Sequence, residues 1–278
     1  MLSVIDSDYV NKCLPEIKET AHKGDCGCLG VLAGSFGMAG AAALSISSAY
    51  RCGAGLVYGF IPKSIYGVLA VLCPNAVFYP SEDYCEWDLN RIKNLDALVI
   101  GCGLGNNDYT AKAVEYFVDS NIPFVLDADG INVLAGRINY IKGKKAVITP
   151  HVGEASRILG CSAADIENDR ALAVKKLAEL SGAVAVLKGH NTLICDGKQT
   201  FVCKRGNNGM ATAGSGDVLA GIIGAFLAQG CLPVEAACLG VYIHALAGDT
   251  AADKLSRRGM CAMDIVTALP EIFKSFEG

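Results

Sequence analysis

Short apolar runs alternate with longer amphipathic or small-residue segments along most of the chain, and this alternation predicts an α/β protein. Residues 1–21 are predicted to form a helical lead-in that Pro15 interrupts. Strands are expected at 28–33, 53–60, 76–79, 96–105 (ending in alternating glycines), 123–126, 146–149 and 184–187. Helices are expected up to residue 51, directly after residue 154, and at 62–72, 109–119, 168–181, 217–229, 234–252 and 262–275.

Buried strands that alternate with helices indicate a mainly parallel central sheet with helices on both faces. Asp196-Gly197 joins two further β-like runs, 192–195 and 199–203, into a predicted hairpin. No repeat, low-complexity segment or linker divides the 278 residues, so we expect a single domain over 1–278. In such sheets ligands bind beyond the carboxyl ends of the strands, where the polar and glycine-rich motifs of this chain fall.

Composition narrows the class of protein. Hydrophobic residues make up 52% of the chain and charged residues 19%, and the net charge is −4 with no long basic run, which argues against nucleic acid as a partner. The most apolar windows, 218–229 and 234–247, carry polar residues and are too short to span a bilayer. The start of the chain is rich in carboxylates and shows no secretory signal.

The 13 cysteines are scattered singly, without a CxxC repeat. We therefore expect reduced, mostly buried thiols in a cytoplasmic protein. The four histidines lie far apart and form no zinc-ligand spacing, so no metal ligand is assigned among them.

The segment from Gly206 to Asp217 is a loop rich in glycine and asparagine that opens into an apolar helix. Gly214 and Gly216 let the backbone approach a ligand closely, because no Cβ stands in the way. The free N–H groups of the first helical turn favour an anion. Asp217 stands beside that anion site, either as a group with chemical work to do or as an ordinary N-cap.

Two more glycine-rich loops follow strands. The loop 34–41 offers backbone N–H groups at a helix start, and the loop 101–105 could line a flat ligand, although each could also be only a tight turn. Asn106 stands where the dinucleotide fingerprint requires its third glycine. The chain also lacks a Walker A motif and a Gly-x-Ser-x-Gly elbow, so phosphate binding of the P-loop type is excluded.

Polar side chains at the other strand ends leave alternatives open. His151 can donate a hydrogen bond to a carbonyl or a phosphate, whereas Glu154 is expected to satisfy free N–H groups in the first turn of a helix. Lys188 is either a cation facing the anion site or a solvated lysine at a hairpin. Asp127 and Asp129 either bind Mg²⁺ through water or cap a short helix at 130–135.

Together these motifs resemble the NAD(P)H-hydrate dehydratase family of the ribokinase-like fold, over nearly the whole chain. The matching pieces are His22-Lys-Gly, Ala33-Gly-Ser, Met38-Ala-Gly-Ala-Ala42, Leu126-Asp-Ala-Asp129, Thr149-Pro-His-Val-Gly-Glu154, Lys188-Gly-x-x-Thr192, Gly209-Met-Ala and Gly214-Ser-Gly-Asp217. The resemblance implies a lyase that repairs hydrated NADH or NADPH. A nucleotide phosphorylates the ring hydroxyl, and elimination of phosphate restores the dihydronicotinamide.

The resemblance also implies roles for residues. Asp217 would be the base that accepts the hydroxyl proton, and Ala41, Gly103, His151 and Asp217 would contact the hydrate. Adenine nucleotide, as ADP or ATP with Mg²⁺, would be bound by Lys188, Gly189, His190, Asn191, Thr192, Gly214, Ser215 and Gly216. The sequence does not distinguish ADP from ATP, but the resemblance to stand-alone bacterial members of the family favours ADP as the phosphoryl donor.

Two residues depart from the family pattern: Cys102 stands where proline is common, and Ala213 replaces a frequent glycine. Only about twenty residues precede His22, so we expect no fused epimerase domain and a separate epimerase acting in the same pathway. A homo-oligomer is also expected. The alternatives are a kinase of the same fold that acts on a thiazole or pyridoxal-type alcohol, and a nucleotide-binding regulator without turnover.

Overall fold

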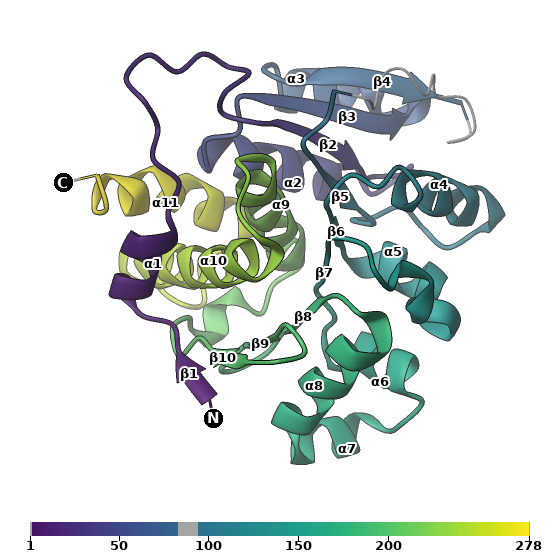
Figure 1. Ribbon diagram of the computed structural model, residues 1–278. Helices are drawn as coiled ribbons and strands as arrows, with labels where there is room; N and C mark the ends of the chain where they lie inside the picture. Colours follow the sequence, from purple (N-terminus) through teal and green to yellow (C-terminus); the bar gives the residue numbers. More distant parts are fainter. Residues whose placement is uncertain (1, 83–93, 278) are drawn as a thin grey trace.

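The computed structural model describes residues 2–82 and 94–277, and within them every strand belongs to one sheet (Figure 1). Its order is β1-β10-β9-β8-β7-β6-β5-β2-β3-β4. The strands are β1 Leu2–Val4, β2 Cys28–Leu32, β3 Leu56–Pro62, β4 Val77–Ser81, β5 Ala97–Ile100, β6 Phe124–Leu126, β7 Ala146–Ile148, β8 Val184–Leu187, β9 Leu193–Cys195 and β10 Thr200–Val202.

The sheet is parallel except at β9, which runs antiparallel to both β8 and β10. The central strands β5, β6, β7 and β8 consist of buried apolar residues throughout, as expected for parallel strands that are covered on both faces. The prediction of a mainly parallel sheet is therefore confirmed, and so is the hairpin of β9 and β10.

Helices cover both faces of this sheet, which also confirms the sequence prediction. Figure 1 shows α2, α9, α10 and α11 on one side and α4 to α8 on the other, and each group packs on its own apolar cluster. The helices are α1 Ser7–Cys13, α2 Ala39–Arg51, α3 Tyr66–Leu72, α4 Asp108–Val118, α5 Ala128–Leu134, α6 Val152–Leu159, α7 Ala163–Asn168, α8 Arg170–Ser181, α9 Ser215–Ala228, α10 Pro233–Leu255 and α11 Ala262–Lys274.

The structure differs from the sequence prediction mainly at the start of the chain. Residues 1–21 were expected to be helical, but Leu2–Val4 forms the edge strand β1 and pairs in parallel with Thr200–Val202. Three residues are too few for an alternating pattern, and the partner strand lies far away in the sequence. Elsewhere β3 begins at Leu56 rather than at residue 53, and the short helix α7 was not foreseen.

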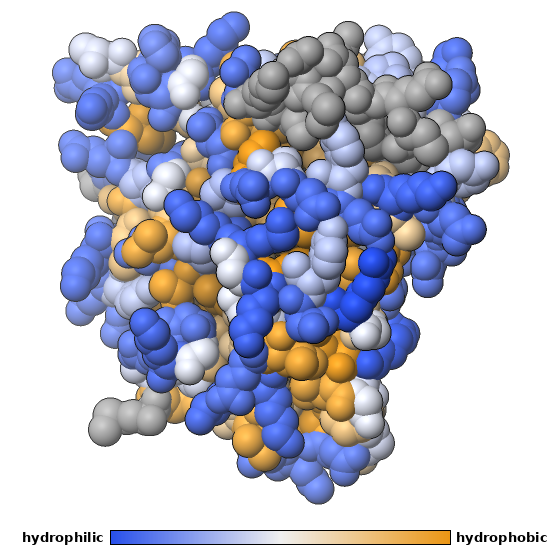
Figure 2. All heavy atoms as spheres, turned by 45° about the vertical axis from the view of Figure 1, so that its right-hand side comes forward, coloured by the Kyte–Doolittle hydropathy of each residue, from blue (hydrophilic) through white to orange (hydrophobic). Residues whose placement is uncertain are grey.

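The twelve described cysteines are all free; the thirteenth, Cys85, lies outside the described residues. Half of the twelve are buried, and among the rest Cys261 is exposed. None of the helices within residues 2–82 and 94–277 has both the length and the apolar character that a membrane crossing requires. On the face shown in Figure 2, hydrophilic side chains predominate and apolar residues gather in a few patches.

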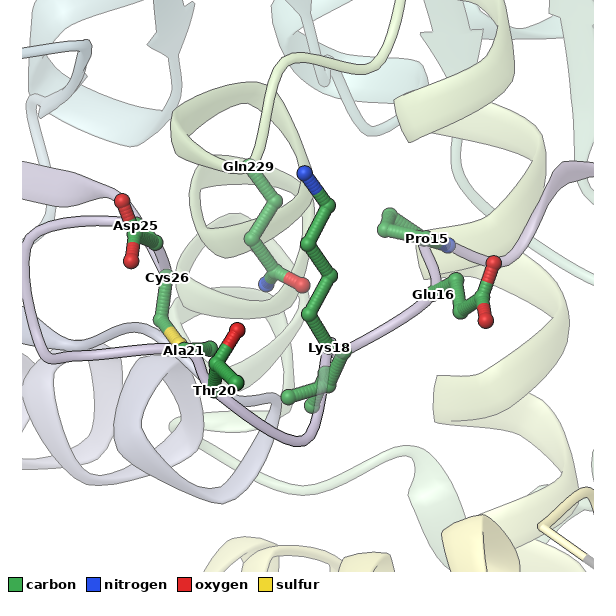
Figure 3. Close-up of a pocket in the computed structure, with 9 residues that line it drawn as sticks. Pro15, Glu16, Lys18, Thr20, Ala21, Asp25, Cys26 and Gln229 are labelled. Atoms are coloured by element: carbon green, nitrogen blue, oxygen red, sulfur yellow. The ribbon is translucent and has the colours of Figure 1, made fainter.

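A small pocket of about 380 Å³ lies where residues 15–26 cross the carboxyl end of α9 (Figure 3). Gln229, which follows α9 directly, lines this pocket and donates a hydrogen bond of 2.8 Å to the carbonyl oxygen of Cys52. Asp217 lies in the first turn of the same helix. The pocket therefore lies at the opposite end of α9 from the predicted site.

Candidate active site

A cleft of about 900 Å³ opens at the carboxyl ends of the parallel strands, where the sequence analysis predicts that a ligand binds. Segments that follow β7, β8 and β10 meet there, because parallel strands all end at the same edge of a sheet. The predicted site residues that line this cleft are His151, Lys188, Gly189, His190, Asn191, Thr192, Gly214, Ser215, Gly216 and Asp217.

The start of α9 forms one wall of the cleft. Gly214 is its N-cap with φ 92°, and a Cβ there would lie 2.4 Å from Leu44 Cδ1, so both the backbone conformation and the packing require glycine. No side chain caps this end. The N–H of Ser215 donates a hydrogen bond of 3.3 Å to the carbonyl oxygen of Thr212. The N–H groups of Gly216 and Asp217 have no partner among the described residues, so these two can bind an anion in the cleft. Asp217 is the third residue of the helix, so the alternative of an ordinary N-cap is wrong.

Asp217 is partly buried beside a second carboxylate. Burial and, after it, the charge of Asp127 raise the pKa of Asp217 to about 6, although Cys102 and Lys188 act in the opposite direction. A carboxyl group with a pKa near 6 is ionised at neutral pH and is a stronger base than an ordinary aspartate. The structure thus sets a carboxylate of raised pKa next to the helix end where the sequence predicts an anion.

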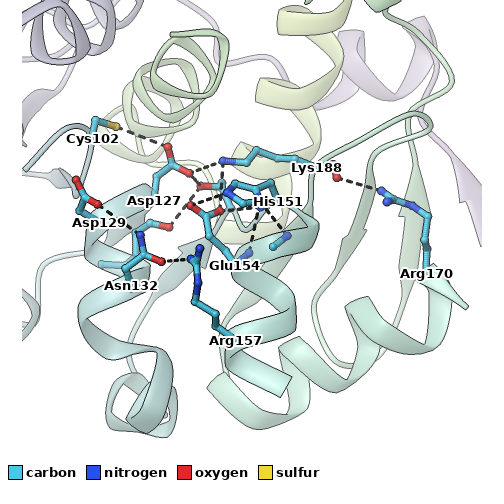
Figure 4. A network of polar contacts seen from close by, with 12 residues as sticks. Cys102, Asp127, Asp129, Asn132, His151, Glu154, Arg157, Arg170 and Lys188 are labelled. Atoms are coloured by element: carbon cyan, nitrogen blue, oxygen red, sulfur yellow. Dashed lines mark hydrogen bonds and ion pairs between the residues drawn. The ribbon is translucent and has the colours of Figure 1, made fainter. Parts of the chain in front are cut away.

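Lys188 follows β8 and faces the first turn of α9. Its Nζ donates a hydrogen bond of 2.7 Å to Asp127 Oδ1 and lies 3.8 Å from Glu154 Oε2 (Figure 4). Burial lowers the pKa of Lys188, but the two carboxylates outweigh it and the pKa is raised. A Cβ on Gly216 would lie 3.4 Å from this Nζ. The alternative of a solvated lysine is therefore wrong, and the ammonium group faces the first turn of α9.

Asp127 and Asp129 have protein partners of their own. Asp127 is buried and also accepts a hydrogen bond of 2.7 Å from Thr149 Oγ1, while Asp129 accepts one of 2.8 Å from the backbone N–H of Gly105. Asp127 occupies the N-cap position of α5, but its side chain makes no capping hydrogen bond. The alternative of helix capping is therefore wrong for the Asp127 side chain, while Asp129 lies in the first turn of α5.

Magnesium prefers an octahedral set of oxygen ligands. One group of potential metal ligands includes a predicted residue: carboxylate oxygens of Asp127 and Asp217 and the thiol of Cys102 lie within 4.8 Å of one another. A thiol is a poor ligand for Mg²⁺, and Asp127 already holds Lys188. These residues therefore do not offer the set of oxygen ligands that a resident magnesium ion prefers.

His151 and Glu154 form a reciprocal cap at the start of α6. His151 Nδ1 accepts hydrogen bonds from the N–H groups of Gly153 (2.9 Å) and Glu154 (3.4 Å). Glu154 Oε2 in turn accepts one of 2.7 Å from the N–H of His151, which confirms its predicted first-turn role. Because Nδ1 is an acceptor, the ring hydrogen lies on Nε2, which lies 3.5 Å from Glu154 Oε1 on a half-exposed ring; its donation to a ligand stays a prediction.

Ala41 and Gly103 lie outside the lining of this cleft but next to one another. A Cβ on Gly103, where φ is 63°, would stand 2.8 Å from Ala41 Cβ. Ser45 Oγ contacts the carbonyl oxygens of both Ala41 (3.1 Å) and Asp217 (3.0 Å). Ala41, in the first turn of α2, and Gly103 therefore lie side by side, and Ser45 links Ala41 to Asp217; their contacts with the hydrate stay a prediction.

Three side chains of the site were missed as functional residues. Arg170 donates to the carbonyl oxygens of Leu187 (3.1 Å) and Lys188 (3.2 Å), and so holds the end of β8 (Figure 4). His244 in α10 is buried, which lowers its pKa to about 4, and its Nε2 lies 3.3 Å from Ser215 Oγ. Cys102 touches Asp127 from the third glycine-rich loop. No sequence motif indicates any of these contacts.

The fold places the chain in the ribokinase-like superfamily, because solved structures of that superfamily match nearly its whole length. Within it, the chain belongs to the NAD(P)H-hydrate dehydratase family, whose model matches residues 29–271. This confirms the resemblance seen in the motifs. Members of this family are enzymes.

Comparison with known proteins gives the same family. The chain is 40% identical to the bifunctional NAD(P)H-hydrate repair enzyme Nnr of Escherichia coli, over 96% of this chain and 51% of that protein. It is 39% identical to the ADP-dependent (S)-NAD(P)H-hydrate dehydratase of Neisseria meningitidis, over 83% and 79%. The chain spans about half the length of the curated relatives that it matches first.

A solved structure extends the match to the fold. The ADP/ATP-dependent NAD(P)H-hydrate dehydratase of Bacillus subtilis, co-crystallised with ATP and Mg²⁺, superposes with a TM-score of 0.89. The sequences are 28% identical, and the match covers 99% of each chain.

Proposed function

We propose that this protein is an ADP- or ATP-dependent dehydratase of hydrated NADH and NADPH, a lyase that repairs nicotinamide cofactors. The observation that carries the proposal is the placement of Asp217, with a pKa of about 6, in the first turn of α9 beside the uncapped N–H groups after Gly214. Phosphoryl transfer to an alcohol needs such a base next to a site for the transferring anion.

In the first step, Asp217 accepts the proton of the ring hydroxyl. At the same time the hydroxyl oxygen attacks the terminal phosphorus of the nucleotide. The bond from that phosphorus to the leaving nucleotide breaks, and the N–H groups of Gly214 to Gly216 hold the transferring group. Lys188 faces the same place and offsets part of the negative charge. Mg²⁺ would be held by the nucleotide phosphates rather than by a set of protein ligands, and it would offset part of their negative charge.

In the second step, the lone pair of the ring nitrogen expels the phosphate from the adjacent carbon. Loss of a proton from the next ring carbon then restores the double bond, so dihydronicotinamide and free phosphate are the products. Ala41, Gly103 and His151 would position the hydrate, and residues 188–192 would bind the nucleotide. ADP as donor is supported by the name of the Neisseria relative, whereas the Bacillus relative is named for both nucleotides.

The repair also needs a partner activity. The hydroxyl must face both Asp217 and the anion site, so only one of the two hydrate stereoisomers should react. An epimerase would supply the other, and the bifunctional names of longer relatives support this pairing of activities. Free cysteines suit a reducing compartment, and we place the protein in the cytoplasm.

The test is incubation of the protein with hydrated NADH or NADPH, Mg²⁺ and either ADP or ATP. Dihydronicotinamide absorbance should return, with one phosphate released for each molecule restored. A phosphorylated alcohol that accumulated from a thiazole or pyridoxal compound, without any return of absorbance, would instead identify a kinase.

A further inference from the structure

The thiol of Cys102 lies between the two carboxylates of the site, and the steps above do not use it. Cys102 Sγ and carboxylate oxygens of Asp127 and Asp217 lie within 4.8 Å of one another. Figure 4 shows Cys102 pointing at Asp127, with Sγ 3.8 Å from Oδ2. The Cys102 side chain is fully buried, so water does not compete for its hydrogen.

The sulfur keeps that hydrogen at neutral pH. Burial, and then the charges of Asp217 and Asp127, raise the pKa of the Cys102 thiol well above its ordinary value. A thiolate in this position would be a third negative charge in one small space. The neutral thiol is instead a hydrogen-bond donor between two acceptors.

We propose that Cys102 is a positioning residue that keeps Asp217 ionised by donating its hydrogen to this pair of carboxylates. The inference rests on the proposed function, in which Asp217 is the base. A hydrogen bond to Asp217 stabilises the charged form of that group directly. A hydrogen bond to Asp127 Oδ2 weakens the repulsion between Asp127 and an ionised Asp217. Donation to either carboxylate therefore lowers the pKa of Asp217.

The other charged groups around Asp217 do not by themselves compensate its negative charge. Asp127 and Asp129 disfavour its ionisation, and Lys188 favours it. Lys188, however, is shared between Asp127 and Glu154. His244, the nearby titratable group of α10, is neutral because burial lowers its pKa to about 4. One shared ammonium group thus faces several carboxylates, and the thiol adds a second donor.

The test compares Cys102→Ala with Cys102→Ser in the acidic limb of the pH profile of hydrate turnover. Removal of the donor should move that limb upward by about half to one pH unit. A hydrogen bond to a charged group typically shifts its pKa by about one unit or more, and a thiol is a weak donor. Serine keeps a donor, so its limb should stay at or below the wild-type position. Cys52→Ala, which removes a buried thiol at the far end of α2, should leave the limb unchanged.

A second measurement does not depend on turnover. The carboxyl carbons of aspartate are labelled with ¹³C, the Asp217 signal is assigned by its loss in Asp217→Asn, and its pKa is read by NMR titration. A raised pKa in Cys102→Ala without turnover in the wild type would support the hydrogen bond and reject the proposed function. An Asp217 pKa that stays unchanged in both variants, or rises equally in both, would overturn the inference. If Cys102→Ala fails to fold, Cys102→Ser decides, because a raised Asp217 pKa in that variant contradicts the role of a donor.

Discussion

At the scale of single residues, Asp217 is held where its charge is disfavoured, because burial and Asp127 together raise its pKa. Burial therefore makes Asp217 a stronger base and, when the group is ionised, lowers the stability of the fold. The unfolded chain has an ordinary aspartate pKa near 3.8, whereas the folded value is about 6. The folded state binds the proton more tightly, so this contribution to stability is present at low pH and is lost as pH rises toward and through about 6.

The substitution Asp217→Asn should separate these two effects. Turnover should fall by about 10²–10⁴-fold, because the amide keeps the shape but cannot accept the proton. The melting temperature at pH 7 should rise, because a disfavoured charge has been removed. Steady-state rates and thermal melts at pH 4 and pH 7 check both outcomes, and the gain in melting temperature should vanish at pH 4. A variant with nearly wild-type turnover would exclude Asp217 as the base.

The same pKa predicts how turnover depends on pH. The base works only when it is ionised, so kcat/KM should fall as the pH drops through about 6. The measurement is a pH profile from 5 to 8 at constant ionic strength, with separate controls that the protein stays folded. An acidic limb centred near pH 4 would mean that the burial of Asp217 does not persist in solution.

At the scale of elements, the start of α9 depends on the backbone of Gly214. In Gly214→Ala, the new Cβ would meet Leu44 in a left-handed conformation, so the first turn of α9 should shift and nucleotide affinity and turnover should fall together. The matched control is Gly136→Ala, where a Cβ would meet nothing within 4 Å. Calorimetric titration with ADP and thermal melts measure both variants. Unchanged ADP affinity in Gly214→Ala would remove this turn from the nucleotide site.

Lys188 connects the end of β8 to the start of α9. Its removal in Lys188→Ala should weaken nucleotide binding and leave hydrate binding nearly unchanged, if the two ligands occupy separate parts of the cleft. It should also destabilise the fold, because Asp127 and Glu154 lose their buried cation. Lys175→Ala, which breaks only an exposed pair with Glu179, is the control for charge. Calorimetry with each ligand decides, and equal nucleotide affinity in both variants would contradict the prediction.

The sequence predicted most of the elements, because buried parallel strands and glycine-rich helix starts leave clear local patterns. Asp217 and its glycines could be found for the same reason. The contacts of Asp127 with Lys188 and Cys102 could not, since they depend on the order β8-β7-β6-β5, which brings three separate strand ends together. Arg170 and His244 act through hydrogen bonds between separate elements and carry no motif.

At the scale of the whole molecule, the homo-oligomer stays a prediction. The helix α3 exposes Val68, Val71 and Leu72, by 52%, 77% and 54%, on a face that nothing else among the described residues covers. We expect a second copy of the chain to bury such a face. Light scattering measures the mass in solution, and Val71→Asp should reduce it if α3 lies in the contact. A monomeric wild-type protein would contradict the prediction.

The edge strand β1 also has a consequence for the newly made chain. Leu2–Val4 pairs with Thr200–Val202, so strand β1 has no partner in the sheet until residue 202 has left the ribosome. The intervening strands can pair in the meantime, because each lies beside a neighbour that is closer in the sequence. Strand β1 can thus join the sheet only after strands β2 to β10 have been made, so this edge of the sheet is completed late in synthesis.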